Sequence, residues 1–167
     1  LILTTQLFYA QEKSIILEKS QTVFIDYQDQ LNIQVETEEQ RLIKKSKNIE
    51  DYQFYISYNN FIDVSNIEGS TQNLKTGKKS KLNINQISNH DVVQENIFHS
   101  DLKYKHISMP VYEDSTSLSF SYIRKYKNPK FVSPFVFADH LEVKKSIFKI
   151  ICDKSIEIGY KLFGLDQ

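Results

Sequence analysis

The chain is poor in glycine, proline and cysteine, and each shortage excludes a class of protein. Its 167 residues include four Gly, three Pro, one Cys and no Trp. A single Cys rules out an internal disulfide and a zinc site built from several thiolates. Four Gly are too few for a glycine-rich phosphate-binding loop or a collagen-like repeat. The 21 basic and 21 acidic residues cancel, whereas nucleic-acid-binding proteins normally carry a basic excess, so no nucleic-acid partner is expected.

The remaining composition is that of a folded domain. Hydrophobic residues make up 40% of the chain and aromatic residues 13%, which is enough for a sizeable core. No stretch approaches the roughly 20 consecutive apolar residues that a membrane-spanning helix needs. The length fits one ordinary domain. We therefore expect residues 12–167 to form a single domain that is truncated at its C-terminal end.

The first ten residues, LILTTQLFYA, are apolar with small polar interruptions and end in Ala10 before the polar run Gln11-Glu12-Lys13. This pattern is typical of the end of a signal peptide with cleavage after Ala10. A first β-strand or a disordered terminus is the alternative interpretation. A signal-peptide remnant over 1–10 predicts export of the protein to the periplasm or the outside of the cell.

In several segments, β-branched and aromatic residues alternate with polar ones. The alternation is clear over 23–28, 31–36, 52–58 and 117–122, and weaker over 143–149. A period of two places one set of side chains in a core and the other in water, as in a half-buried strand. The charged segment 37–50 lacks a continuous apolar stripe at helical spacing. We expect it to continue a strand or form a hairpin, with one short helix as the alternative.

Turn signals separate these segments. Asn59-Asn60 can adopt positive φ, as a two-residue hairpin loop requires. Thr76-Gly77-Lys78-Lys79 has the composition of an exposed hairpin tip. Further turns are expected at 113–115 and 128–129, and strand ends at Pro110 and Pro134. Strands at this spacing predict an all-β fold, specifically an antiparallel β-sandwich.

The sequence predicts no catalytic, cofactor-binding or metal-binding residue. Cys152 lies in the apolar run FKIICDK, where a free Cys is expected to be a buried small hydrophobe. The residues weighed as metal ligands are His90, Asp91, His99, Asp101 and His106. His99 and Asp101 would share one face of a strand, but the spacing matches no strong metal pattern. A surface role on hairpins is therefore the preferred interpretation of these residues, and an enzyme within this chain is not expected.

A strip of basic and aromatic residues occupies 122–131, YIRKYKNPKF. Such a strip can bind single-stranded nucleic acid or glycan by stacking and charge. Because the net charge is zero and the chain has only two Arg, a solvated strand face is the preferred interpretation. The candidates for stacking on a glycan or peptide ligand are Tyr104, Tyr112, Tyr126 and Phe131.

The region from Ile62 to about Ile158 carries a pattern of turn and core residues. An aromatic, a Ser-Asp pair and a basic residue precede a block of proline, turn and strand, and an aromatic block follows. The residues of the pattern are Phe98, Ser100, Asp101, Lys103, Pro110, Phe120, Tyr122, Phe135, Phe137 and Val143. The region resembles the uncharacterised β-domain that precedes transglutaminase-like domains in secreted bacterial proteins. It departs from that family at Asp114-Ser115, where the family usually has Gly in the turn.

The resemblance implies a non-catalytic N-terminal accessory or interaction module of an exported protein. The downstream transglutaminase-like domain would carry a Cys-His-Asp triad in the papain manner, and no residue of this chain is assigned to that triad. The partners implied are that downstream domain and a protein or glycan. The alternative is a stand-alone β-module that binds a glycan or a peptide.

Overall fold

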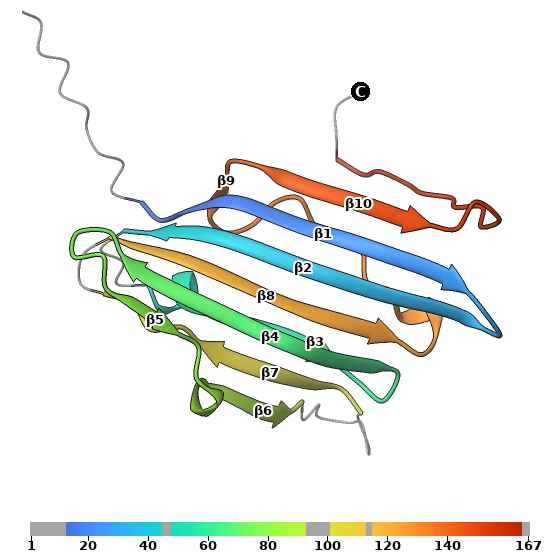
Figure 1. Ribbon diagram of the computed structural model, residues 1–167, viewed down its shortest axis with the longest axis horizontal. Helices are drawn as coiled ribbons and strands as arrows, with labels where there is room; N and C mark the ends of the chain where they lie inside the picture. Colours follow the sequence, from blue (N-terminus) through green and yellow to red (C-terminus); the bar gives the residue numbers. More distant parts are fainter. Residues whose placement is uncertain (1–12, 45–47, 93–100, 113–114, 165–167) are drawn as a thin grey trace, which may run out of the picture.

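The chain folds almost entirely into strands (Figure 1). A computed structural model describes residues 13–44, 48–92, 101–112 and 115–164. In these ranges the regular elements are ten strands and three short 3₁₀ helices, so the predicted all-β class is confirmed. None of the helices in the described ranges could reach across a lipid bilayer.

The larger of two sheets contains seven strands in the order β10-β1-β2-β8-β4-β5, with β9 also pairing with β1. Its strands are β1 (Ile15–Tyr27), β2 (Leu31–Ile43), β4 (Ile62–Asn73), β5 (Lys79–Lys81), β8 (Thr116–Tyr126), β9 (Glu142–Val143) and β10 (Ser146–Cys152). The smaller sheet has the order β3-β7-β6. Its strands are β3 (Gln53–Tyr58), β6 (Ile87–Asp91) and β7 (Lys103–Ser108).

Strands β1 and β2 form the hairpin that the alternation predicts. Val23 pairs with Val35, and Ile25 pairs with Ile33, so the apolar side chains of both strands share one face. The charged segment after residue 36 continues β2 as far as Ile43, as expected for a strand continuation. In the described part of the segment, the short helix that was the alternative is represented by one 3₁₀ turn, η1 (Ile49–Tyr52).

The large sheet is mixed rather than purely antiparallel, which corrects the predicted pairing. Both β9 and β10 run parallel to β1. Lys144 N–H donates to Ile16 O at 2.9 Å, and Lys19 N–H donates to Lys145 O at 2.9 Å. Strands β9 and β10 therefore act as one interrupted strand. A parallel partner requires a long connection, and here it is the segment 127–141 after β8, which is irregular apart from the 3₁₀ turn η3 (Pro129–Phe131).

Two of the predicted turns have different outcomes. Thr76–Lys79 forms the tip of the β4–β5 hairpin, with Gly77 at φ +73°, as predicted. Asn59-Asn60 is a turn, but it links β3 to β4, and these strands belong to different sheets. The pair is therefore a crossover between layers and not a hairpin loop. Residues 113–114 of another predicted turn lie outside the described residues.

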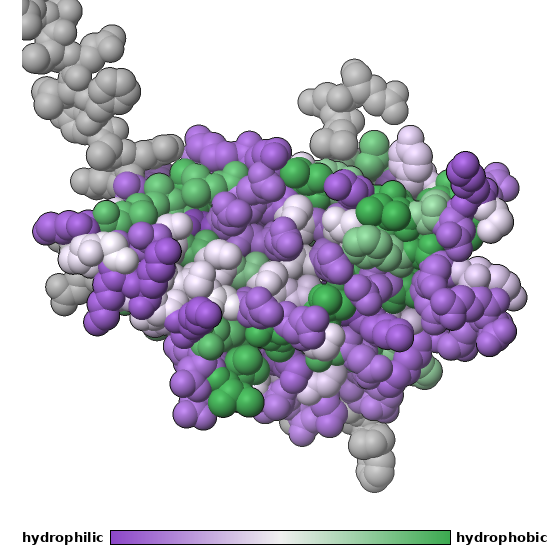
Figure 2. Space-filling view, viewed as in Figure 1, coloured by the Kyte–Doolittle hydropathy of each residue, from purple (hydrophilic) through white to green (hydrophobic). Residues whose placement is uncertain are grey.

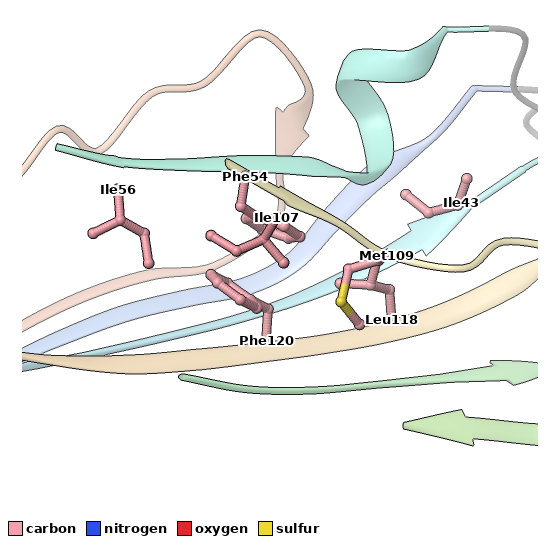
Figure 3. Packing of buried hydrophobic residues seen from close by; sticks show 7 residues of the cluster. All are labelled: Ile43, Phe54, Ile56, Ile107, Met109, Leu118 and Phe120. Carbon is pink, nitrogen blue, oxygen red and sulfur yellow. The ribbon is translucent and has the colours of Figure 1, made fainter. Parts of the chain in front are cut away.

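The two sheets pack face to face around one apolar cluster (Figure 3). In Figure 3, Phe54 and Ile56 of β3 and Ile107 of β7 point toward Phe120 of β8. The buried members of the cluster are Ile43, Phe54, Ile56, Ile107, Met109, Leu118 and Phe120. The small sheet thus covers only part of the inner face of the large sheet. Figure 1 shows β3 behind β4, with β7 and β6 beyond the β4–β5 edge.

A second cluster lies farther along the inner face of the large sheet, where Tyr58 at the end of β3 packs against it. Its buried members are Val23, Ile33, Val35, Ile62 and Tyr126. Val132, from the segment after β8, packs against this cluster, and Phe135 from the same segment stacks on Phe148 of β10 at 5.4 Å. The segment 127–141 is therefore the second cover of the inner face. A groove lies in the space between the two covers.

Candidate functional site

A groove of about 510 Å³ separates the two covers of the inner face, and we call it the edge groove. Its floor is the inner face of β2 and β8, one wall is β3, and the other wall is the end of segment 127–141. The residues that define it are Thr37, Glu39, Tyr55, Tyr122, Asp139 and His140. Ligand pockets in proteins have volumes of about 300–1,000 Å³, so the edge groove has the size of a binding site.

The floor of the edge groove contains an ion pair on an otherwise apolar face. The alternation of β2 places Glu39 and Arg41 on the same side as the buried Val35 and Ile43. The Arg41 guanidinium pairs with Glu39 and donates to Asp51 O at 2.8 Å. Only 5% of Arg41 is exposed. The pair links β2 to η1 and fixes the floor beside β3.

Arg41 also contacts an aromatic ring of the core. Its guanidinium carbon lies 4.2 Å from the centre of the Phe54 ring. A guanidinium at this distance from a ring face is attracted by the ring quadrupole. One side chain therefore connects the polar floor of the edge groove to the contact between the sheets.

Strand β3 presents an unpaired edge to the groove. Met109 N–H donates to Tyr52 O at 3.0 Å, and Gln53 pairs with Ser108 in the same antiparallel register. Main-chain groups alternate in direction along an antiparallel strand, so those of Gln53, Tyr55 and Ser57 point away from β7. No described strand pairs with that edge of β3. These N–H and C=O groups are available to a ligand.

The opposite wall is held in place by the polar contacts of Asp139 and His140. Lys19 Nζ lies 3.0 Å from Asp139 Oδ2, and His140 Nδ1 lies 2.6 Å from Asp139 Oδ1. His140 Nε2 lies 3.8 Å from Oδ1 of the buried Asp51. Burial acts to raise the pKa of Asp139, but hydrogen bonding and attraction to Lys19, with smaller contributions from His140, outweigh it and lower the pKa. Asp139 is therefore ionised at neutral pH.

Acidic groups outnumber basic ones in the lining of the edge groove. The carboxylates are those of Glu39, Glu50 and Asp139, and the one permanent cation is Arg41. Arg41 is already paired with Glu39 and with main-chain oxygens. Among the described residues, no three His, Cys, Asp or Glu side chains are arranged to hold a metal ion. Glu39 is neutralised by Arg41 and Asp139 by Lys19, so the lining carries an excess of one carboxylate, Glu50. The groove therefore favours a cationic, partly apolar ligand.

The sequence analysis did not single out the residues of the edge groove, although a signal was present. Glu39 and Arg41 continue the buried face of an alternating strand, and charges on such a face are expected to be paired. Asp139 and His140 carried no such pattern, because they lie in a segment without regular structure. Only the fold brings them to η1 and β3.

The four residues proposed for ligand stacking lie in separate places. Tyr126 is buried in the second cluster and only 2% exposed, so its ring is not on the surface. Tyr112 Oη is hydrogen-bonded to Ser80 Oγ at 2.8 Å. Phe131 stacks on Phe61 with ring centres 4.6 Å apart, and both rings are exposed. Tyr104 alone belongs to a larger aromatic array.

That array covers the outer face of the small sheet. Tyr104 stacks on His90 at 4.9 Å, and Tyr55 stacks on His106 at 4.9 Å. The two stacks are linked by a tilted contact of 5.9 Å between Tyr55 and Tyr104. Cross-strand ring pairs of this kind stabilise a sheet. Two histidines that were weighed as metal ligands, His90 and His106, are therefore part of a stacked aromatic surface.

The residues of the family pattern lie mainly at strand ends and in the core. Phe120 is buried and Tyr122 is half-buried on β8, Asp101 precedes β7, and Pro110 follows it. Phe135 and Phe137 make an edge-to-face contact at 4.8 Å in the segment that covers the second cluster. Phe98 and Ser100 lie outside the described residues, as does the metal candidate His99.

Cys152 is exposed, which corrects the expectation of a buried residue. It is the last residue of β10 and pairs with Ile25. The apolar run that contains it follows the edge of the large sheet, where only one side of a strand is covered by a neighbour. An apolar run at a sheet edge is therefore less buried than the same run in a central strand.

Comparison with known proteins gives a family and a similar fold. The sequence profile of a family described as a domain of unknown function with a solved structure, DUF3857, matches residues 30–167. No curated protein sequence matches the chain. The fold is similar to the crystal structure of a "putative protease" from Parabacteroides distasonis, with a TM-score of 0.70 and 13% sequence identity. The match covers 85% of this chain and 29% of that chain, so the present chain spans less than a third of the solved protein.

Proposed function

The chain belongs to the DUF3857 family, and we propose that it is a non-catalytic accessory module of a larger exported protein with a downstream transglutaminase-like domain. The observation that carries the proposal is the extent of the structural match. The fold of this chain matches 29% of a protein described as a "putative protease", which leaves most of that protein to other parts. The expected export rests on residues 1–10, which lie outside the described residues.

The region around β10 supports a role beside another domain. Several large apolar side chains of β10 and the segment after it are exposed. They are Phe148, Ile151, Tyr160, Leu162 and Phe163. Figure 2 shows hydrophobic side chains gathered on this part of the surface. Large exposed apolar side chains that are close together in the chain can belong to a site that another domain or protein covers.

The positions of potential catalytic groups also support a non-catalytic module. The only Cys, Cys152, pairs with Ile25 of β1, whereas Asp139 beside His140 contacts Lys19 of the same strand. Positions 19 and 25 are six residues apart, which is about 20 Å along a strand. A thiolate nucleophile needs its base within hydrogen-bonding distance. Cys152 and His140 are therefore not suited to act as a pair.

The first test is the reading frame beyond Gln167. We expect it to continue into a domain with Cys, His and Asp at transglutaminase-like spacing. A stop codon directly after Gln167 would contradict the accessory role. The alternative would then remain, a stand-alone β-module that binds a glycan or a peptide. The presence of the edge groove favours that alternative.

The second test concerns the surface near β10 in the longer protein. Leu162→Lys combined with Phe163→Lys should lower the thermal midpoint and expose the junction to limited proteolysis, because two charges would enter the interdomain contact. Ser155→Lys, in the same exposed segment, is the matched control and should change neither. Equal behaviour of the two variants would show that this surface does not contact the downstream domain.

A further inference from the structure

We propose that the edge groove binds an extended peptide segment carrying Lys or Arg, and that this segment adds to β3 as a fourth strand of the small sheet. This inference goes beyond the accessory role, because it assigns a ligand class to residues of this chain alone. It rests on the free edge of β3, the space beside that edge and the charge of the lining.

The free edge supplies the main-chain part of the recognition. Strand β3 lies at one end of the order β3-β7-β6. The N–H and C=O groups of Gln53, Tyr55 and Ser57 point away from β7, as the Met109–Tyr52 hydrogen bond and the antiparallel alternation require. An added strand would satisfy these groups with its own main chain, which is how exposed sheet edges recognise extended peptides.

The space beside the edge is open and follows the strand. The edge groove runs along Gln53–Ile56, with a volume of about 510 Å³. A strand lies about 4.8 Å from its neighbour and rises about 3.3 Å per residue, so three or four peptide residues match this stretch of β3. Side chains of the added strand that point inward would meet Thr37 and Tyr122 on the floor.

The charge of the lining selects the side chains of the peptide. Glu39 is paired with Arg41, and Asp139 is paired with Lys19, so these charges cancel. Glu50 is the carboxylate of the lining that exceeds these pairs, and its charge favours a basic side chain over an acidic one. Tyr122 on the floor offers a cation–π contact to a basic side chain that points inward, and Tyr55 offers one to a side chain that points outward.

Binding is tested with the 167-residue chain and short labelled peptides. The probe is a capped hexapeptide of alternating Lys and Val, the matched control has Glu in place of Lys, and a neutral hexasaccharide represents a glycan. We expect fluorescence anisotropy or competition to show at least tenfold tighter binding of the Lys peptide than of the Glu peptide, weakening with added salt. Equal binding of the two peptides, no binding, or binding of the saccharide alone would overturn the proposal.

Two substitutions at one position separate strand addition from ring stacking. Tyr55→Pro removes an N–H that makes no bond to β7, and Pro is compatible with an edge strand. Tyr55→Ser also removes the ring but keeps that N–H. We expect Tyr55→Pro to bind the Lys peptide at least tenfold more weakly than Tyr55→Ser, with circular dichroism showing that both variants fold. Equal affinities would exclude main-chain pairing at β3.

Hydrogen exchange in the unmodified chain gives a test that does not depend on the folding of a variant. On addition of the Lys peptide, the amide protons of Tyr55 and Ser57 should exchange at least tenfold more slowly, because they become hydrogen-bonded. The amide protons of Lys78 and Lys79 at the β4–β5 tip are the internal control and should not change. Unchanged exchange at Tyr55 and Ser57 would overturn the proposal, whatever lies downstream of Gln167.

Discussion

Phe54 of β3 stacks on Phe120 of β8 with ring centres 4.0 Å apart and ring planes at 23°, and this contact joins the two sheets. Both rings are buried, at 8% and 3% exposed. The stack lies beside the edge groove, since both residues contribute to its lining. The contact between the sheets therefore also sets the distance between β3 and the groove floor.

We expect Phe120→Ala to lower the free energy of unfolding by about 3–5 kcal/mol, because a buried ring is lost and a cavity remains between the sheets. Urea denaturation monitored by circular dichroism measures this change. Ser119→Ala, at the exposed neighbouring position, is the control and should have little effect. A Phe120→Ala variant as stable as the control would mean that the sheets do not pack through this ring.

Because Glu39 and Arg41 form an ion pair, substitutions of these two residues should have non-additive effects on the free energy of unfolding. Arg41→Met leaves the Glu39 carboxylate and the Asp51 carbonyl without their donor, and breaking a buried pair on one side costs about 3–5 kcal/mol. We expect the lower end of this range, because the Glu39 side chain keeps 12% exposure. Adding Glu39→Gln to Arg41→Met should recover part of the loss in the same denaturation experiment. A double variant less stable than Arg41→Met would show that the charge of Glu39 is satisfied elsewhere.

The sequence was sufficient to predict the strands that are recognised by local alternation. Val23, Val35 and Phe120 all lie in segments with a period of two, and all three are buried. Their environment depends mainly on which face of the strand they occupy, and the residues nearby in sequence determine that face. The positions of these strands and the all-β class can therefore be predicted from the local alternation of apolar and polar residues.

The partners of the strands depend on contacts far apart in the sequence and could not be predicted. Asn59-Asn60 has the composition of a hairpin loop, but β3 and β4 join different sheets. Cys152 appeared in a core-like run, yet β10 is placed at a sheet edge by its parallel pairing with β1. Asp139 reaches the edge groove through Lys19, which is 120 residues away. Local propensity carries no information on such pairings.

The tip of the β4–β5 hairpin predicts a requirement for the side chain of Asn73. Its Oδ1 accepts from Lys75 N–H at 2.8 Å and from Thr76 N–H at 2.9 Å, and Asn73 is 6% exposed. Asn73→Ala should lower the free energy of unfolding by about 1–2 kcal/mol, because two partly buried donors lose their acceptor. Asn73→Asp keeps the acceptor oxygen and should retain most of the stability in a thermal or urea unfolding experiment. Equal losses in the two variants would show that the acceptor oxygen is not what stabilises the tip.

The wall of the edge groove predicts a dependence of stability on acid. The pKa of Asp139 is lowered in the folded state: burial opposes the shift, and Lys19 and His140 outweigh it. Because the folded-state pKa lies below the unfolded one, the stabilisation by Asp139 is present above the ordinary carboxyl pKa of about 3.9 and is lost as pH falls through the folded-state pKa. The difference in unfolding free energy between the unmodified chain and Asp139→Asn should therefore narrow as the pH falls through the ordinary carboxyl pKa and below it. When both proteins also carry Lys19→Met, the difference in unfolding free energy should narrow less with falling pH, because the main cation beside Asp139 is gone. A difference that stays constant with pH, or that narrows equally in both backgrounds, would show that Lys19 does not hold this carboxylate in its charged form.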